Sequence, residues 1–569
     1  MWDIDFAEIF GDKGGFDIVI GNPPYVTRTY ISPPNRIKSE VTKEERDDYK
    51  SRLINSVNVT FPEVKHLSKM CDYYIYFYFH GLGLLNDEGT FCYITSNSWL
   101  DVDYGRELQE FLCKYVPIIS IYDNRKRSFT HADINTVIAL LGAPNVKQKG
   151  LGNFMSGLNG GNKVTWPNIR HVAKFVMFKK SFENAISPKN LIDIENVKIS
   201  AQGGTITDWV KNILTNDDYR VFSLYQEDLL EDGWEYPVNH GKDKFAGGSY
   251  IGNKWGGKFL RAPDIFYTIL ERGKNSLLKL SDVAEVRIGI MSGLNEFFWL
   301  KKVKEVGDHF VLKNGLGWEF ALEKQFVREA IKSPRELDKL YVNTSEIKQA
   351  LFMCNLNRSE LKKDYPLAFD YILTGEKEGF NKRPFFNGRK NWWDCGAREK
   401  ASINCNYMIN DMIRFYFNET GFLVSDNFHQ IYATANAEVM AAICNSTLMQ
   451  LMVGVFGRVT FGGGLIKLQT TDAKNIFLVD PNRIDKTEKL KSSFKKLSKK
   501  TIDTIFEELG IDPNVPIREQ EPKPLPDRAE LDNIVFDELG LTQDERKEVY
   551  WSVCELVKQR IDKARSLRD

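Results

Sequence analysis

The feature that most constrains the fold is a short apolar run that ends in a proline-rich turn. Residues 16–20 read FDIVI, Gly21 follows, and residues 22–25 are Asn-Pro-Pro-Tyr. A run of this length with β-branched residues is typical of a buried parallel strand. Because proline fixes φ and has no N–H, Pro23 and Pro24 end the strand and hold a rigid turn at its carboxyl end.

Alternating strands and helices are predicted from this turn to about residue 150. Apolar periodicity indicates further strands at 90–95, 117–121 and 134–141, and helices at 72–85 and 104–115. Strand–helix–strand order with short connections predicts an α/β fold, with half of a doubly wound sheet in residues 1–150.

Three further regions are expected. Residues 151–275 contain glycine clusters and several tryptophans, and we interpret them as a connecting region. Residues 276–482 combine short strands and helices with many aromatic residues, which predicts an α+β domain. Residues 483–569 are expected to be helical, with an extended proline-rich linker at 512–527 and a last helix that begins at a capping box of Thr542 and Glu545.

Composition limits the classes of function. Basic and acidic residues both number 77, which argues against a general nucleic-acid coat but leaves room for a local basic groove. The seven histidines lack metal-ligand spacing, so no metal site is expected. The eight cysteines lie far apart, which favours buried thiols in a reducing compartment. The sequence shows no signal peptide and no apolar stretch long enough for a bilayer, so we expect a cytoplasmic protein without membrane contact.

The turn at residues 22–25 has the groups that methyl transfer to an exocyclic base amine requires. The lone pair of that nitrogen is delocalised into the ring, and two acceptors for its hydrogens would localise the lone pair and offset the developing positive charge. Asn22 offers a side-chain carbonyl, and Pro23 offers a backbone carbonyl. Pro24 stiffens the turn, and Tyr25 offers a flat face for a base swung out of a duplex. The plainer alternative is a strand-ending turn with an exposed tyrosine.

The family resemblance begins at this turn. The run FDIVIGNPPYV at 16–26 resembles motif IV of amino-methyltransferases. The segments DYYIYFYFHGLGLL, GTFCYITSNSWL and YGRELQEFL resemble motifs V, VI and VII, and residues 118–141 resemble motif VIII. The order is closest to the gamma-class adenine methyltransferases of type IIG restriction-modification systems. The resemblance implies the C-terminal half of a Rossmann-like methyltransferase sheet that acts on adenine.

A second resemblance concerns the region after residue 276. The segment LSDVAEVRIGIMSGLNEFFWL at 280–300 is similar to the opening of a TaqI-like specificity domain, and residues 426–481 are similar to its close. This resemblance implies a target-recognition domain, with double-stranded DNA as the partner.

The resemblance assigns roles to individual residues. It implies that Asn22 and Pro23 bind the target amine, and that Tyr25 stacks on the adenine. Phe129, in the segment that resembles motif VIII, is the expected second stacking residue, and the alternative is a core phenylalanine at the entrance to a strand.

In the specificity region, RPFFNGRKNWWD places Arg383 and Arg389 among four aromatic residues. Arginine is the commonest reader of guanine edges, so both are candidate DNA contacts. The alternative is a basic surface loop over two core tryptophans.

The chain departs from the family before motif IV. The glycine-rich loop that binds S-adenosylmethionine should lie tens of residues ahead of Asn22, but only 21 residues precede it. GLNGGNK at 157–163 follows no predicted strand and is interpreted as a loop. We therefore expect the cofactor pocket in a missing N-terminal segment, lost by truncation or decay or supplied by a separate chain, and an exposed edge on the sheet.

Two hypotheses follow from these patterns. In the first, the chain is a site-specific DNA adenine methyltransferase component that is inactive alone. In the second, it is a DNA-recognition subunit or a remnant without catalysis of its own. Type IIG enzymes also carry a nuclease, and the weak ExK pattern at Glu63–Lys65 does not assign one to this chain.

Overall fold

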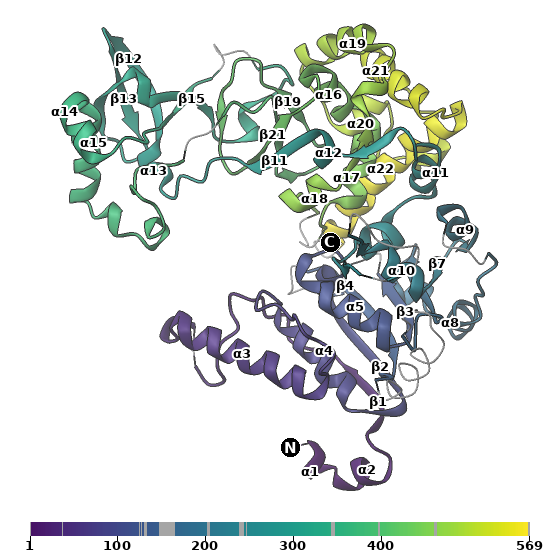
Figure 1. The fold of residues 1–569 in the computed structure, drawn as a ribbon. Helices are drawn as coiled ribbons and strands as arrows, with labels where there is room; N and C mark the ends of the chain where they lie inside the picture. The colour runs from purple at the N-terminus through teal and green to yellow at the C-terminus, as the bar shows by residue number, and fades with distance from the viewer. Residues whose placement is uncertain are drawn as a thin grey trace. The chain divides into compact units, whose positions relative to one another are not determined.

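The computed structural model describes residues 2–566 except 37, 125, 127, 130–133, 147–165, 202–204, 238–243, 246, 343–346, 397–398 and 460–463. The glycine-rich run 157–163 therefore lies outside the described residues. The chain folds into two compact units, each assembled from segments that are separate in the sequence (Figure 1). Unit 1 comprises Met1–Glu271, Arg458–Ile466 and Lys558–Asp569, and unit 2 comprises Arg272–Gly457 and Lys467–Val557.

Unit 1 is built on a mixed seven-stranded sheet. Its order is β1-β2-β4-β3-β5-β7-β6. The strands are β1 (Phe16–Gly21), β2 (Leu85–Ser96), β3 (Ile118–Asp123), β4 (Thr136–Gly142), β5 (Val172–Phe178), β6 (Ile213–Thr215) and β7 (Tyr219–Tyr225). The pairs β1–β2 and β3–β5 are parallel, and the other neighbours are antiparallel. The prediction that the first four strands share one sheet is confirmed.

Helix α4 (Tyr73–Gly83) of unit 1 packs on this sheet through aromatic side chains. The other main helices are α1 (Trp2–Asp5), α2 (Ala7–Asp12), α3 (Lys43–Thr60), α5 (Arg106–Tyr115) and α10 (Gln226–Asp232). In α4, Tyr74, Tyr78 and Phe79 are completely buried, and the Tyr78 ring lies 5.3 Å from that of Phe91 on β2. Burial on the sheet explains why this helix is apolar around most of its circumference.

The region 151–275 does more than connect two domains. It adds β5, β7 and β6 to the sheet that β1 begins, so unit 1 continues to Glu271 rather than ending near residue 150. The sequences VAKFVMF and YRVFSLY of β5 and β7 are almost wholly buried. Such strands lack the alternation of polar and apolar residues that marks a half-exposed strand, and the sequence pattern is unclear for this reason.

Unit 2 contains two mainly antiparallel sheets followed by helices, in agreement with the α+β fold predicted for residues 276–482. One has the order β14-β13-β12-β16-β15-β20 and the other β11-β21-β17-β19. The strands are β11 (Ala284–Ile288), β12 (Trp299–Val306), β13 (His309–Asn314), β14 (Glu319–Glu323), β15 (Val327–Ile331), β16 (Gln349–Phe352), β17 (Ile403–Asn406), β19 (Phe415–Phe417), β20 (Leu423–Val424) and β21 (Phe428–Ala433).

The helical end of the chain does not form a separate domain. Its helices, up to residue 557, belong to unit 2 together with residues 272–457 and 467–482. The helices named below are α16 (Ala437–Cys444), α17 (Thr447–Phe456), α19 (Thr487–Lys499), α20 (Ile505–Leu509), α21 (Pro526–Glu538) and α22 (Gln543–Arg565). The predicted capping box of Thr542 and Glu545 is confirmed by reciprocal hydrogen bonds at the start of α22. Residues 512–527 are expected to form an extended linker, but Ile517 within them is buried. This segment therefore packs against the rest of unit 2.

Two features expected from composition can be compared with the structure. All eight cysteines are free thiols, and seven of them are buried. Among the described helices, none taken singly has the length and hydropathy to cross a membrane, and the one apolar pair that does, α16 with α17, is bent by 69°.

A buried ion pair fastens the helices of unit 2. Arg528 on α21 is 1% exposed and lies 2.8 Å from the carboxylate of Glu508, which is fully buried on α20. The guanidinium also donates to the carbonyl of Asn445 at 2.7 Å. On the next turn of α21, Asp532 accepts from the backbone and the hydroxyl of Thr447. Removal of Arg528 would leave the fully buried Glu508 with the partly exposed Lys500, 3.4 Å away, as its remaining ion pair.

We predict that Arg528→Ala lowers the free energy of unfolding of unit 2 by about 3–5 kcal/mol, because Glu508 would remain charged in the interior. Arg483→Ala is the matched control, since Arg483 pairs with Glu538 on the surface and should cost less than about 1 kcal/mol. Urea denaturation followed by tryptophan fluorescence measures both. Equal losses in the two variants would contradict a structural role for the buried pair.

Candidate functional site

The turn at residues 22–25 lies at the carboxyl end of β1. Parallel pairing of Gly21 with Tyr93 places it beside the last residues of β2. Pro23 is buried, whereas Asn22 and Pro24 are exposed. The amide of Asn22 makes no hydrogen bond to any described residue, so its carbonyl is available as an acceptor. In open α/β sheets, ligands bind at this end of the strands.

Tyr25 is fixed against the neighbouring strand. Its hydroxyl donates to the carbonyl of Ile94 on β2 at 3.3 Å. Burial raises the pKa of Tyr25 to about 12, so the phenol is even harder to ionise than an exposed tyrosine. The ring is therefore held as an uncharged flat surface at the strand ends.

Phe129 lies next to Tyr25, as the resemblance to motif VIII implies. The two ring centroids are 5.7 Å apart and the ring planes are inclined by 52°. A base stacked between the rings would need planes about 7 Å apart, twice the stacking distance of bases, so one ring would have to rotate on binding. Tyr25 is held by its hydrogen bond to Ile94, so Phe129 is the ring expected to move.

The chain beyond the turn is held by the start of α4. The carbonyl of Val26 accepts from the backbone of Tyr73 at 2.9 Å. The backbone of Arg28 donates to Asp72 at 2.8 Å, and Asp72 also accepts from the hydroxyl of Tyr104 at 2.6 Å. These bonds limit the movement of the chain that follows the turn.

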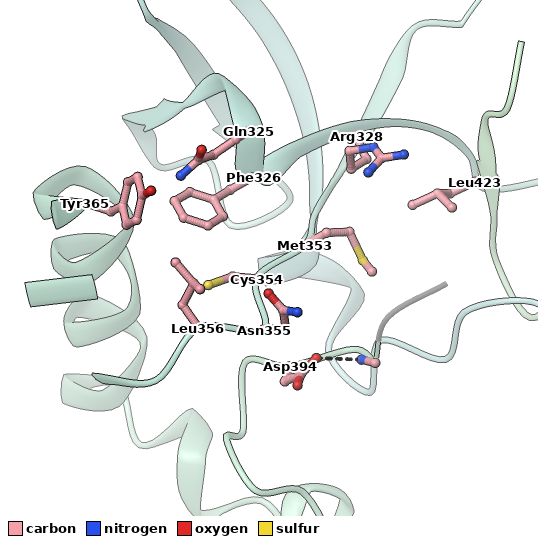
Figure 2. A pocket seen from close by; sticks show the side chains of 11 residues that line it. Gln325, Phe326, Arg328, Met353, Cys354, Asn355, Leu356, Tyr365, Asp394 and Leu423 are labelled. Atoms are coloured by element: carbon pink, nitrogen blue, oxygen red, sulfur yellow. Dashed lines mark hydrogen bonds between the residues drawn. The ribbon is translucent and has the colours of Figure 1, made fainter. Parts of the chain in front are cut away.

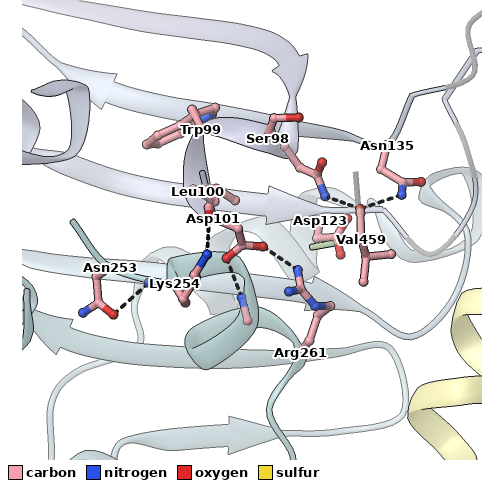
Figure 3. Close-up of polar contacts among 12 residues, drawn as sticks. Ser98, Trp99, Leu100, Asp101, Asp123, Asn135, Asn253, Lys254, Arg261 and Val459 are labelled. Carbon is pink, nitrogen blue, oxygen red and sulfur yellow. Dashed lines mark hydrogen bonds and ion pairs between the residues drawn. The ribbon is translucent and has the colours of Figure 1, made fainter. Parts of the chain in front are cut away.

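A distant segment reaches the same end of the sheet. Asn97, which follows β2, and Asn135, which precedes β4, both donate to the carbonyl of Val459, at 3.4 and 3.0 Å (Figure 3). Next to it, Arg458 pairs with Asp103 at 3.2 Å. Sequence reasoning missed Asn97 and Asn135, because no local pattern indicates a partner more than 300 residues away.

The loop after β2 is also supported by residues 253–261. Asp101 is 3% exposed and accepts from Arg261 at 2.9 Å and from the backbone of Gly257 at 3.0 Å (Figure 3). A side chain at Gly256 would place a Cβ 2.7 Å from the Asp101 carboxylate. The close approach therefore requires glycine at this position.

We predict that Asp101→Ala destabilises unit 1 by about 3 kcal/mol, because the Arg261 guanidinium, which is only 16% exposed, loses its ion pair with this carboxylate. Asp48→Ala serves as the control, since Asp48 is 58% exposed and its partner Arg52 is 76% exposed on the same helix, so this pair should contribute less than about 1 kcal/mol. Chemical denaturation gives the energies, and amide hydrogen exchange should show faster exchange in residues 97–101 only for Asp101→Ala. Similar exchange in both variants would show that Asp101 does not hold the loop.

The two arginines predicted in the specificity region differ in their surroundings. Arg389 is partly buried, and its guanidinium donates to the carbonyl of Met291 at 2.8 Å. Arg383 is exposed and lies over the ring of Phe380 at 5.2 Å. Trp392 and Trp393 belong to the core of unit 2. Arg389 thus has a structural contact, whereas Arg383 is more exposed to solvent.

The described residues ahead of the turn form a short segment of the fold. Residues 2–21 form α1, α2 and β1, without a glycine loop between a strand and a helix. β1 is an edge strand of the described sheet, and Ile18 and Ile20 on one of its faces are 67% and 76% exposed. Within the described residues, no group of three or more His, Cys, Asp or Glu side chains could hold a metal ion.

Unit 2 contains a cavity of about 370 Å³ beside β15 and β16 (Figure 2). Arg328 and Asp394 bring charge to its wall, and Asp394 accepts from the backbone of Gly396 at 2.7 Å. None of the predicted site residues lines it.

Two regions of the chain match known protein families. Residues 1–129 match the family described as Eco57I restriction-modification methylase. Residues 252–510 match the C-terminal domain of the Type II methyltransferase M.Eco57I. Over these two regions the chain is thus similar to restriction-modification methylases.

Individual relatives agree with the family matches. The Type II methyltransferase M.AccI of Acinetobacter calcoaceticus is 24% identical over 244 residues, which are 39% of this chain and 42% of the relative. M.BstVI of Geobacillus stearothermophilus is 28% identical over 128 residues, or 22% of this chain and 18% of the relative. The chain spans less than half the length of either protein.

Two solved structures are similar over most of the chain. The type IIG restriction endonuclease BpuSI is 11% identical, with a TM-score of 0.37, over 96% of this chain and 54% of its own. A DrdV–DNA complex is 10% identical, with a TM-score of 0.36, over all of this chain and 58% of its own.

Proposed function

We propose that the chain is a component of a site-specific DNA adenine methyltransferase of a type IIG restriction-modification system. The observation that carries the proposal is the position of residues 22–25 at the carboxyl end of β1, with Phe129 beside Tyr25. The family matches support methylase chemistry in general. The choice of adenine, the gamma class and the type IIG organisation rest on the order of the motifs in the sequence.

The proposed mechanism assigns binding and orientation to this turn. The side-chain carbonyl of Asn22 and the backbone carbonyl of Pro23 accept the two hydrogens of the adenine amine. The lone pair of the nitrogen is then directed out of the ring plane, and the positive charge that develops is offset without a general base. Tyr25 and Phe129 enclose the flipped base, while Pro24 keeps the acceptors in place. S-adenosylmethionine would supply the methyl group.

A segment that adds strands to the free edge of β1 and also covers its exposed face is the proposed source of the donor pocket. The exposed Ile18 and Ile20 support this part of the proposal, because isoleucines on an inner strand of an α/β sheet are normally covered. The segment belongs either to the same polypeptide or to a second chain. Double-stranded DNA is the other proposed partner, with Arg383 and Arg389 as candidate contacts, and the cytoplasm is the proposed location.

A second candidate function is a DNA-recognition subunit, or a remnant, without catalysis of its own. The exposed face of β1 and the lack of a strand–glycine loop–helix unit within the described residues 2–21 favour this alternative, and the acceptor groups at Asn22 and Pro23 favour the enzyme. The two functions predict different results once a donor segment has been supplied. If the chain is part of an enzyme, a substitution in residues 22–25 lowers kcat; if it is a recognition subunit, the substitution does not change kcat.

Asn22→Ala in the enzyme completed with a donor segment should lower kcat on the order of 100-fold or more, and should change DNA affinity little. The reason is that the contact of Asn22 strengthens as charge develops on the amine. Asn196→Ala, at an exposed helix end away from the turn, is the control. Tritium transfer to DNA and a binding titration measure the two quantities. Unchanged kcat would favour the recognition subunit.

We also predict that residues 1–569 alone bind S-adenosylmethionine weakly or not at all, and that the added segment restores binding. Ile20→Lys should block this restoration, because it places a charge on the face that the segment would cover. Ile4→Lys is the control, since Ile4 is 79% exposed outside the sheet. Calorimetry with S-adenosylmethionine measures donor binding by each variant, with and without the added segment. Tight donor binding by the chain alone would contradict this part of the proposal.

A further inference from the structure

Two exposed apolar side chains lie in segments of unit 2 that Arg389 joins. Phe385 is 50% exposed and Met291 is 47% exposed, although both lie in loops beside the core. The guanidinium of Arg389 links these loops, because it donates to the carbonyl of Met291 and lies 5.1 Å from the centroid of the Phe385 ring. We call this pair of side chains the apolar knob.

Phe385 is held firmly in spite of its exposure. A Cβ at Gly293 would come within 2.1 Å of the Phe385 ring, so the backbone of that loop lies directly against the ring. Phe386 packs edge-on to Phe385, with centroids 5.5 Å apart, and is itself 3% exposed in the core. Three neighbours, Gly293, Phe386 and Arg389, therefore fix the ring while half of it faces solvent. An immobilised aromatic group of this kind loses little conformational entropy when it binds.

The charge around the knob is basic. Residues 382–390 contain Lys382, Arg383, Arg389 and Lys390 and no acidic residue, and the segment 288–295 contains no charged residue, with Glu296 directly after it. Lys382, Arg383 and Lys390 are exposed. A polyanion is the partner that this arrangement complements. An apolar side chain between cations is also how architectural proteins insert a wedge between base steps of duplex DNA.

We infer that Phe385, with Met291 beside it, is a wedge that unstacks one base step of bound duplex DNA, while the flanking cations hold the phosphates. The inference rests on the proposed function, because it requires DNA to be the partner of unit 2. The wedge would make recognition depend on how easily the DNA deforms. Sequences that unstack easily at the position of Phe385 would bind more tightly.

The test begins with a duplex selected by the full chain from a pool with a randomised centre. 2-Aminopurine is then placed at successive positions of the selected duplex. With the unmodified chain, fluorescence should rise at one step. Phe385→Ala should abolish that rise and weaken binding roughly 5- to 150-fold, the range found when an aromatic stack on a base is removed. Phe385→Trp should preserve both, because it keeps a flat apolar face.

Val303→Ala is the matched control. Val303 is 53% exposed and lies among Lys301, Lys302 and Lys304 on β12, so it shares apolar exposure and positive surroundings but lies on a different element. It should leave fluorescence and affinity unchanged. If Phe385→Ala retains the fluorescence rise and the affinity, the wedge is wrong while DNA recognition stands. If the chain selects no duplex, both the wedge and the proposed function are contradicted.

Discussion

The candidate site depends on the parallel pairing of β1 with β2. This pairing brings the end of an N-terminal strand beside the loop that follows β2, and two prolines then prevent β1 from continuing. Asn22 and the carbonyl of Pro23 are consequently presented at an edge where Tyr25 bonds to Ile94 and packs beside Phe129. The contacts of Asp72, Asn97, Asp101 and Asn135 hold the loops at this end of the sheet in place.

Much of the sheet and of the site can be predicted from the sequence. The first four strands have clear apolar runs, and the resemblance to motif VIII is sufficient to place Phe129 near Tyr25. Both depend on patterns that are local in sequence or shared with a family. The strands β5 and β7 are not predicted, because side chains buried on both faces leave no alternation to detect.

Contacts between distant residues could not be predicted. Nothing near Asn97 or Asn135 in the sequence indicates that both donate to Val459, and nothing in 458–466 indicates that this segment belongs to unit 1. The arginines of the specificity region illustrate a related limit. A sequence can suggest that Arg389 reads a base, but only the structure reveals that its guanidinium already bonds to Met291. The same guanidinium lies against the ring of Phe385, so the arginine has a role that composition alone would not suggest.

The central claim is that the turn at residues 22–25 orients an adenine amine of DNA for methylation. It is tested most directly by mass spectrometry of nucleosides from DNA treated with the chain, a donor segment and S-adenosylmethionine. The account predicts N6-methyladenine, which is lost when Asn22 is replaced by alanine. Methylation of cytosine instead, or N6-methyladenine that persists without the Asn22 carboxamide, would contradict it.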